Sequence, residues 1–83
     1  MLLLCDFNAF STMEEAYDYL EKELSLPAWF GRNLDGLYDC LTDVGQPLTF
    51  LLPPVQESIP AKRLLPVLED AAKENPNLSI RTY

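Results

Sequence analysis

Three short apolar runs divide the chain. Residues 1–7 (MLLLCDF) and 47–54 (PLTFLLPP) are almost wholly apolar, whereas residues 77–83 (NLSIRTY) alternate apolar and polar side chains. Continuous apolar runs are typical of strands in a parallel sheet that helices cover, and alternation is typical of an edge strand with one face in water. The pattern therefore predicts three strands, the last of them at an edge.

Apolar residues recur at helical spacing between the first two strands. Ser11 and Glu14 fit a capping box, in which the serine oxygen accepts an amide hydrogen and the glutamate reaches back. The apolar positions that follow continue to Leu24, and Pro27 ends this first helix.

Two more helices are indicated. Asn33 is a favourable N-cap for a second helix with a leucine stripe, which Gly45 and Pro47 end. A third helix opens near Pro60 and closes at residues 73–77 (KENPN). Pro66 lies inside its apolar pattern, where it either begins the regular part or kinks it.

The element order is strand, helix, helix, strand, helix, strand. Strands separated by helices predict an α/β fold, a small three-stranded parallel sheet packed with helices. Right-handed crossovers between neighbouring strands in the order 1-2-3 place the helices on one face. With 83 residues and no linker or repeat, we expect a single domain over residues 1–83, near the lower size limit for a self-sufficient core.

Charge narrows the classes of partner. The chain has 13 acidic and 6 basic residues, a net charge of −7 and no basic patch. Such a surface repels nucleic acid and anionic membrane and attracts cationic partners, so we expect no direct nucleic-acid binding and no membrane binding.

The N-terminal run is too short for a membrane span and lacks the positive start of a signal peptide, so we expect a cytoplasmic protein. There Cys5 and Cys40 should be reduced and buried, with a disulfide between them as the less favoured alternative.

Three aspartates stand out in the second helix. Asp35, Asp39 and Asp43 are four residues apart and share one face, with no lysine or arginine among them. They repel each other, and the last two also oppose the helix dipole. A run of charge alone favours a solvated face. Trp29 just before the helix and Tyr38 among the acids favour instead a surface that binds a basic protein.

Residues 26–43 (LPAWFGRNLDGLYDCLTD) resemble the signature of the barstar family, intracellular inhibitors of barnase-type ribonucleases. The shared pattern is leucine-proline, two aromatics, glycine, Asn-Leu-Asp, a small residue, leucine, an aromatic and aspartate, before a helix end with threonine. The resemblance implies a barstar-like fold and a mechanism. In the family this loop and helix plug the ribonuclease active site, and one aspartate takes the place of an RNA phosphate; by motif position that residue would be Asp39 here.

The resemblance also implies the residues around Asp39 that contact the partner. The neighbouring contact positions hold Trp29, Asn33, Asp35, Tyr38 and Thr42, and Asp70 matches an acidic residue late in the last helix. Three positions depart from the best-known member of the family. Tyr38 and Val44 stand where it has tryptophans, and Arg32 stands where it has an acid. These three changes retain the acidic residues that the resemblance places in the ribonuclease active site. They leave the identity of the partner open.

The expected partner is a basic ribonuclease of the extracellular, barnase-like type, and we expect a monomer without a cofactor in the free state. One alternative is an acidic interaction module that binds another basic protein. A second is an enzyme in which Asp35 and Asp39 hold Mg²⁺ or act as an acid–base pair. Because the chain has no histidine, no glycine-rich phosphate loop and no nucleophile–base motif, we expect neither an enzyme nor a metal site.

Overall fold

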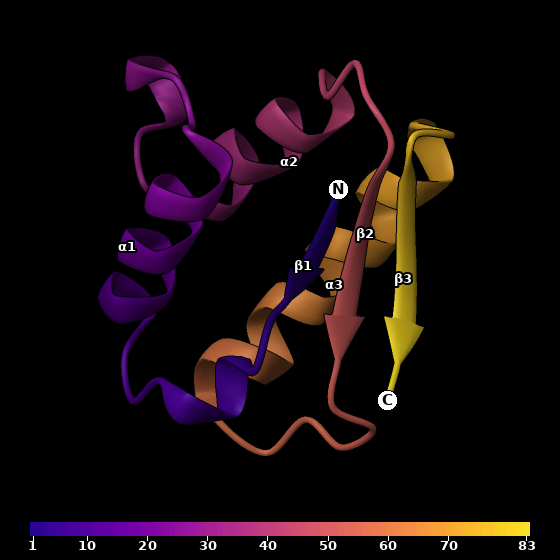
Figure 1. The fold of residues 1–83 in the computed structure, drawn as a ribbon. Coiled ribbons are helices and arrows are strands. Elements are labelled where there is room, and N and C mark those ends of the chain that lie inside the picture. Colours follow the sequence, from indigo (N-terminus) through magenta and orange to yellow (C-terminus); the bar gives the residue numbers. More distant parts are fainter.

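A computed structural model describes all of residues 1–83, and it contains a three-stranded parallel sheet with helices packed on it (Figure 1). The strands are β1 (Leu2–Leu4), β2 (Leu48–Leu52) and β3 (Leu78–Thr82), paired in the order β1-β2-β3. The helices are α1 (Met13–Leu24), α2 (Leu34–Thr42) and α3 (Ile59–Glu74), with short 3-10 turns η1 (Phe7–Ala9) and η2 (Ala28–Phe30). The predicted α/β fold and strand order are confirmed.

The start of α1 corrects the predicted capping box by one residue. Thr12, not Ser11, is the N-cap, because its side-chain oxygen accepts the amide hydrogen of Glu15 at 3.3 Å. The Glu15 carboxylate accepts in return from the amide of Thr12 at 3.1 Å. Two overlapping serine/threonine–glutamate pairs fit the pattern, and sequence spacing does not distinguish them. The helix ends with Ser25 in the left-handed region (φ 51°), so the chain turns before it reaches Pro27.

The other two helices begin at side-chain caps. Asn33 is the N-cap of α2, as predicted, and its side-chain oxygen accepts from the amide of Gly36 at 2.7 Å. Ser58 caps α3 in the same way through the amide of Ala61, at 3.1 Å. Pro66 does not begin the regular part of α3, because one continuous helix runs through it to Glu74.

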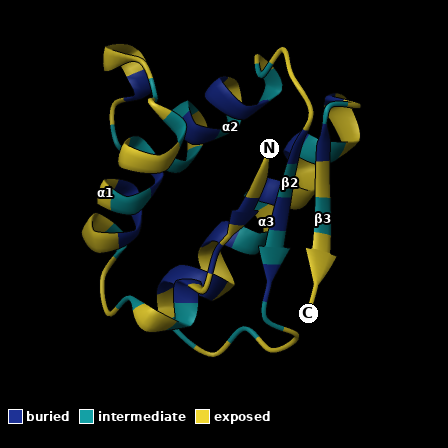
Figure 2. Cartoon of the chain, in the orientation of Figure 1, coloured by how far each residue is buried: buried dark blue, intermediate teal, exposed yellow.

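Helices cover only one face of the sheet, as the right-handed crossovers predict. Phe50 and Leu52 of β2 are buried on that face, as are Leu3 and Leu78 on the neighbouring strands. On the other face Leu2 and Leu4 are exposed, and β3 is exposed along most of its length (Figure 2). The apolar run at the start of the chain therefore supplies an exposed face as well as a buried one.

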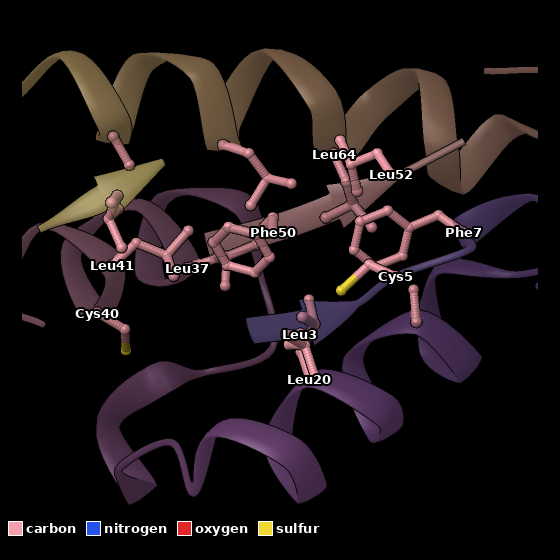
Figure 3. Packing of buried hydrophobic residues seen from close by; sticks show 14 of the residues in the cluster. Leu3, Cys5, Phe7, Leu20, Leu37, Cys40, Leu41, Phe50, Leu52 and Leu64 are labelled. Carbon is pink, nitrogen blue, oxygen red and sulfur yellow. The ribbon is translucent and has the colours of Figure 1, made fainter. Parts of the chain in front are cut away.

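The core lies between the sheet and the helices. Figure 3 shows Cys5 and Phe7 from the first segment beside Phe50 of β2 and Leu37 of α2. Cys5 and Cys40 are both free thiols and both buried, as predicted. The burial of Leu37 and Leu41, each 0% exposed, fixes which face of α2 points outward. None of the three helices is long and apolar enough to cross a membrane.

Candidate partner-binding site

The two faces of α2 have opposite character. Leu37, Cys40 and Leu41 are buried, whereas Asp35 and Asp39, and Asp43 at the C-cap, are exposed. At 3.6 residues per turn, burial of the leucine stripe turns residues 35 and 39 toward solvent. None of the three carboxylates forms an ion pair, because every ion pair in the structure belongs to Arg32. The acidic face of α2, which we define as Asp35, Asp39 and Asp43, is therefore uncompensated.

A neutral side chain closes the C-terminal end of α2. The last turn holds no basic residue. Instead the buried amide of Asn75, just beyond α3, donates to the carbonyl oxygens of Leu41 at 3.0 Å, Thr42 at 3.3 Å and Val44 at 2.9 Å. The Thr42 carbonyl at the end of the helix has no other protein donor, whereas Leu41 also accepts from the amide of Val44, and Val44 from the side chain of Asn77. Because an amide carries no net charge, the end of the helix is stabilised without neutralising the acidic face.

Burial and nearby carboxylates act on both thiols. Burial raises the pKa of Cys40, and the carboxylates of Asp39 and Asp43 raise it further. Burial also raises the pKa of Cys5 to about 12, with a smaller contribution from Glu23. Both thiols are therefore protonated and unreactive near neutral pH.

The loop before α2 places two adjacent aromatic rings on opposite sides. Phe30 is 1% exposed, and its ring meets the ring of Tyr17 edge-on at a centroid distance of 5.5 Å. Trp29 is 57% exposed and points away from the core. A Cβ on Gly36 would overlap the carbonyl oxygen of Phe30, so only glycine lets the loop rest directly on α2.

Six of the seven predicted contact residues come from this loop and α2. Trp29, Asn33, Asp35 and Asp39 are exposed. Tyr38 is half-buried and packs against the core, so part of its ring is committed to the fold. Thr42 is also half-buried, and its hydroxyl donates to the carbonyl of Asp39 at 2.9 Å.

The seventh residue comes from a different helix. Asp70 is on α3, exposed, and forms neither a hydrogen bond nor an ion pair. Asn33 differs in another way, because its side chain already bonds the amide of Gly36 and, at 3.3 Å, the carbonyl of Gly31. Its amide is therefore needed for the fold as well as for any contact.

A surface pocket of about 530 Å³ lies beside the acidic face. It is bounded by the loop after α1 and by the turn between α2 and β2, and Trp29, Asp43 and Val44 are among its lining residues. The exposed tryptophan therefore stands beside a concave part of the surface. No group of three or more histidine, cysteine, aspartate or glutamate side chains is placed to hold a metal ion.

Comparison with known proteins agrees with the fold and the motif. A family model described as Barstar (barnase inhibitor) matches residues 1–81. A protein of Bacillus subtilis (strain 168) named "Putative ribonuclease inhibitor YrdF" is 43% identical over 51 residues, which are 60% of this chain and 56% of that protein. Both descriptions are of inhibitors rather than enzymes, in agreement with the expectation that the chain is not an enzyme. Because the family model extends from the first strand into the last, the chain belongs to the barstar family.

Proposed function

We propose that this protein inhibits a barnase-like ribonuclease, and that residues 27–43 plug the active site of the enzyme. The observation that carries the proposal is the uncompensated acidic face of α2, on which three carboxylates stand without a cation. Membership of the barstar family supports it, as does the name of the Bacillus subtilis relative. The missing counter-charges would then belong to the partner.

The chemistry of the site fits such a partner. A ribonuclease binds RNA phosphates through cationic side chains, and a carboxylate accepts two parallel hydrogen bonds from a guanidinium much as a phosphate does. Asp39, in the middle of the acidic face, would take the place of the phosphate. Trp29 would supply apolar contact area at one side, and Asp70 a further carboxylate from α3. The inhibitor would act in the cytoplasm on a basic enzyme of the extracellular type.

The test is a titration of a barnase-type ribonuclease in an RNA-cleavage assay. We expect one molecule of the protein to block one molecule of enzyme. Asp39→Ala should abolish most of the inhibition. Glu57→Ala removes the same charge from the loop between β2 and α3, outside residues 27–43, and should inhibit like the parent.

A basic protein of similar charge that is not a ribonuclease completes the test. If this competitor binds as tightly as the enzyme, the protein is a general acidic interaction module. If the enzyme cleaves RNA at its full rate with the parent in excess, the proposed inhibition is wrong.

A further inference from the structure

Arg32, in the loop of residues 27–33, contacts α1. It follows Gly31, and both residues have a positive φ, 70° for Gly31 and 52° for Arg32. A residue with a Cβ rarely adopts this conformation, and it persists only where the surroundings impose it.

The guanidinium of Arg32 forms ion pairs with three carboxylates of α1. Nη2 of Arg32 lies 3.0 Å from Oε2 of Glu14 and 2.7 Å from Oδ1 of Asp18, and Nη1 pairs with Glu21. Nη2 also donates to the backbone carbonyl of Glu14 at 3.1 Å. The guanidinium carbon lies 5.8 Å from the centre of the Tyr17 ring, within the range of a cation–π contact. The acids are four and three residues apart, so they share one face of α1.

These contacts attach the loop to α1, in addition to its contacts with α2. On the α2 side, Gly36 lets the backbone of Phe30 rest on the helix, and Asn33 caps it. On the α1 side, Arg32 forms every ion pair in the molecule. The exposed Trp29 lies in the same loop, immediately before Phe30.

The same contacts turn a positive charge away from the acidic face. Arg32 is the one cation of the loop, and a guanidinium beside Asp35 and Asp39 would neutralise charge that a basic partner needs. Because the guanidinium is bound to α1, its positive charge is paired with acids outside the proposed docking surface. The hydrogen bonds that Arg32 donates to Glu14 and Asp18 raise the pKa of Arg32 above its usual value, so the side chain is a cation near neutral pH.

We infer that Arg32 is a positioning residue, which holds loop 27–33 in the conformation that binds the partner by bridging the loop to Glu14, Asp18 and Glu21. This inference rests on the proposed function for its effect on binding. A loop that is free to sample other conformations lowers the apparent affinity by the fraction of molecules that remain competent. Arg32 is 34% exposed and outside the core, so its removal should loosen the loop and leave the fold intact.

The first experiment uses the free protein and needs no partner. Trp29 is the single tryptophan and lies in this loop, so its fluorescence reports on the loop alone. Arg32→Ala should lower its anisotropy and increase its quenching by acrylamide, and Arg32→Lys should fall between the variant and the parent. Raising the salt concentration to 1 M should move the parent toward Arg32→Ala, because exposed ion pairs are screened. Lys22→Ala removes the same charge from a residue without an ion pair and should leave the fluorescence unchanged.

The second experiment measures binding to the ribonuclease. If release of the loop leaves about a tenth of the molecules competent, Arg32→Ala should weaken binding on the order of tenfold, with the lysine variant in between. A triple variant, Glu14→Gln with Asp18→Asn and Glu21→Gln, should weaken binding as well, although it keeps the arginine. Urea unfolding of each variant should show the same cooperative transition as the parent, which separates positioning from loss of the fold.

Several results would overturn the inference. If the triple variant binds like the parent while Arg32→Ala binds weakly, the arginine contacts the partner directly. If Arg32→Ala binds more tightly, the cation only repels the partner. If the Trp29 signal of Arg32→Ala equals that of the parent, the arginine does not hold the loop. Should the parent inhibit no ribonuclease, the proposed function fails, and the Trp29 measurements alone decide whether Arg32 positions the loop.

Discussion

Asp39 offers a test in which stability and binding should change in opposite directions. In Asp39→Ala the free protein loses a carboxylate that has Asp35 four residues before it and Asp43 four residues after it. Each like-charge pair at this spacing costs about 0.2–0.5 kcal/mol, so two pairs cost about 0.4–1 kcal/mol. The helix dipole adds to this penalty, because Asp39 lies toward the C-terminal end of α2, where no basic residue offsets its charge. The hydrogen bond that the Thr42 hydroxyl donates to the backbone carbonyl of residue 39 is retained, because the substitution leaves the backbone in place.

We therefore expect the free energy of unfolding of Asp39→Ala to equal that of the parent or to exceed it by up to about 1 kcal/mol. Urea unfolding, followed by circular dichroism, measures this difference. The gain should shrink in 1 M salt, where the Debye length falls to about 3 Å. Glu57→Ala, which relieves no pair on α2, should show no gain and serves as the control.

Binding should respond with a loss. Close charge pairs in the barnase–barstar complex contribute several kcal/mol to the binding free energy. By analogy, we expect Asp39→Ala to lose roughly several kcal/mol of binding free energy, mostly through a faster off-rate. Asp43→Ala, at the end of the acidic face, should lose much less. Destabilisation of the free Asp39→Ala protein by more than about 1 kcal/mol would show that the residue is structural. Binding equal to that of the parent would remove the acidic face from the proposed mechanism.

Three further predictions concern electrostatic steering of the partner, the C-terminal end of α2 and a buried thiol. The on-rate for the ribonuclease should fall steeply as stopped-flow measurements pass about 0.1 M salt, where the Debye length is about 10 Å, and a constant on-rate would contradict steering by the acidic face. Asn75→Ala should lower the free energy of unfolding by about 1–3 kcal/mol in urea, since it leaves the carbonyl of Thr42 without a protein donor and removes one of the two donors to Leu41 and Val44, and Asn75→Asp should be at least as damaging. Because the pKa of Cys5 is raised from 9.0 to about 12, the unfolded state alone loses this proton between those values, so stability should fall as pH rises through that window. Cys5→Ala should fall less steeply in alkaline urea titrations, with Cys40→Ala as the comparison.

The fold follows from local signals that the sequence displays. Apolar runs, a cap at Asn33 and the turn at Gly45 and Pro47 indicate each element and its order, and the handedness of crossovers then fixes the sheet. The error at the first capping box arose where two neighbouring residues offered the same chemistry, Ser11 and Thr12. Leu2 and Leu4 were not assigned to a face, because an apolar run does not show which side of the sheet lacks helices.

The details of the candidate site depend on contacts between distant residues. The exposed face of α2 follows from its leucine stripe, so its three aspartates could be identified from spacing alone. Asn75 and Arg32 could not, because an asparagine in a turn and an arginine in a loop have no pattern that names a partner. Gly36 matched the family motif as a small residue, but the reason for glycine appears only when the loop is seen resting on the helix.

The bonds from Asn75 also bear on the order in which the protein matures during synthesis. They join residues 31 to 34 positions apart, and a further bond from the side chain of Asn77 reaches Val44 at 3.1 Å. A ribosome makes α2 well before it makes these two asparagines. A nascent chain that stops short of residue 75 carries all three aspartates on a helix whose C-terminal end is still open. We therefore expect the proposed docking surface to be fully ordered only once Asn75 and Asn77 have emerged and folded back.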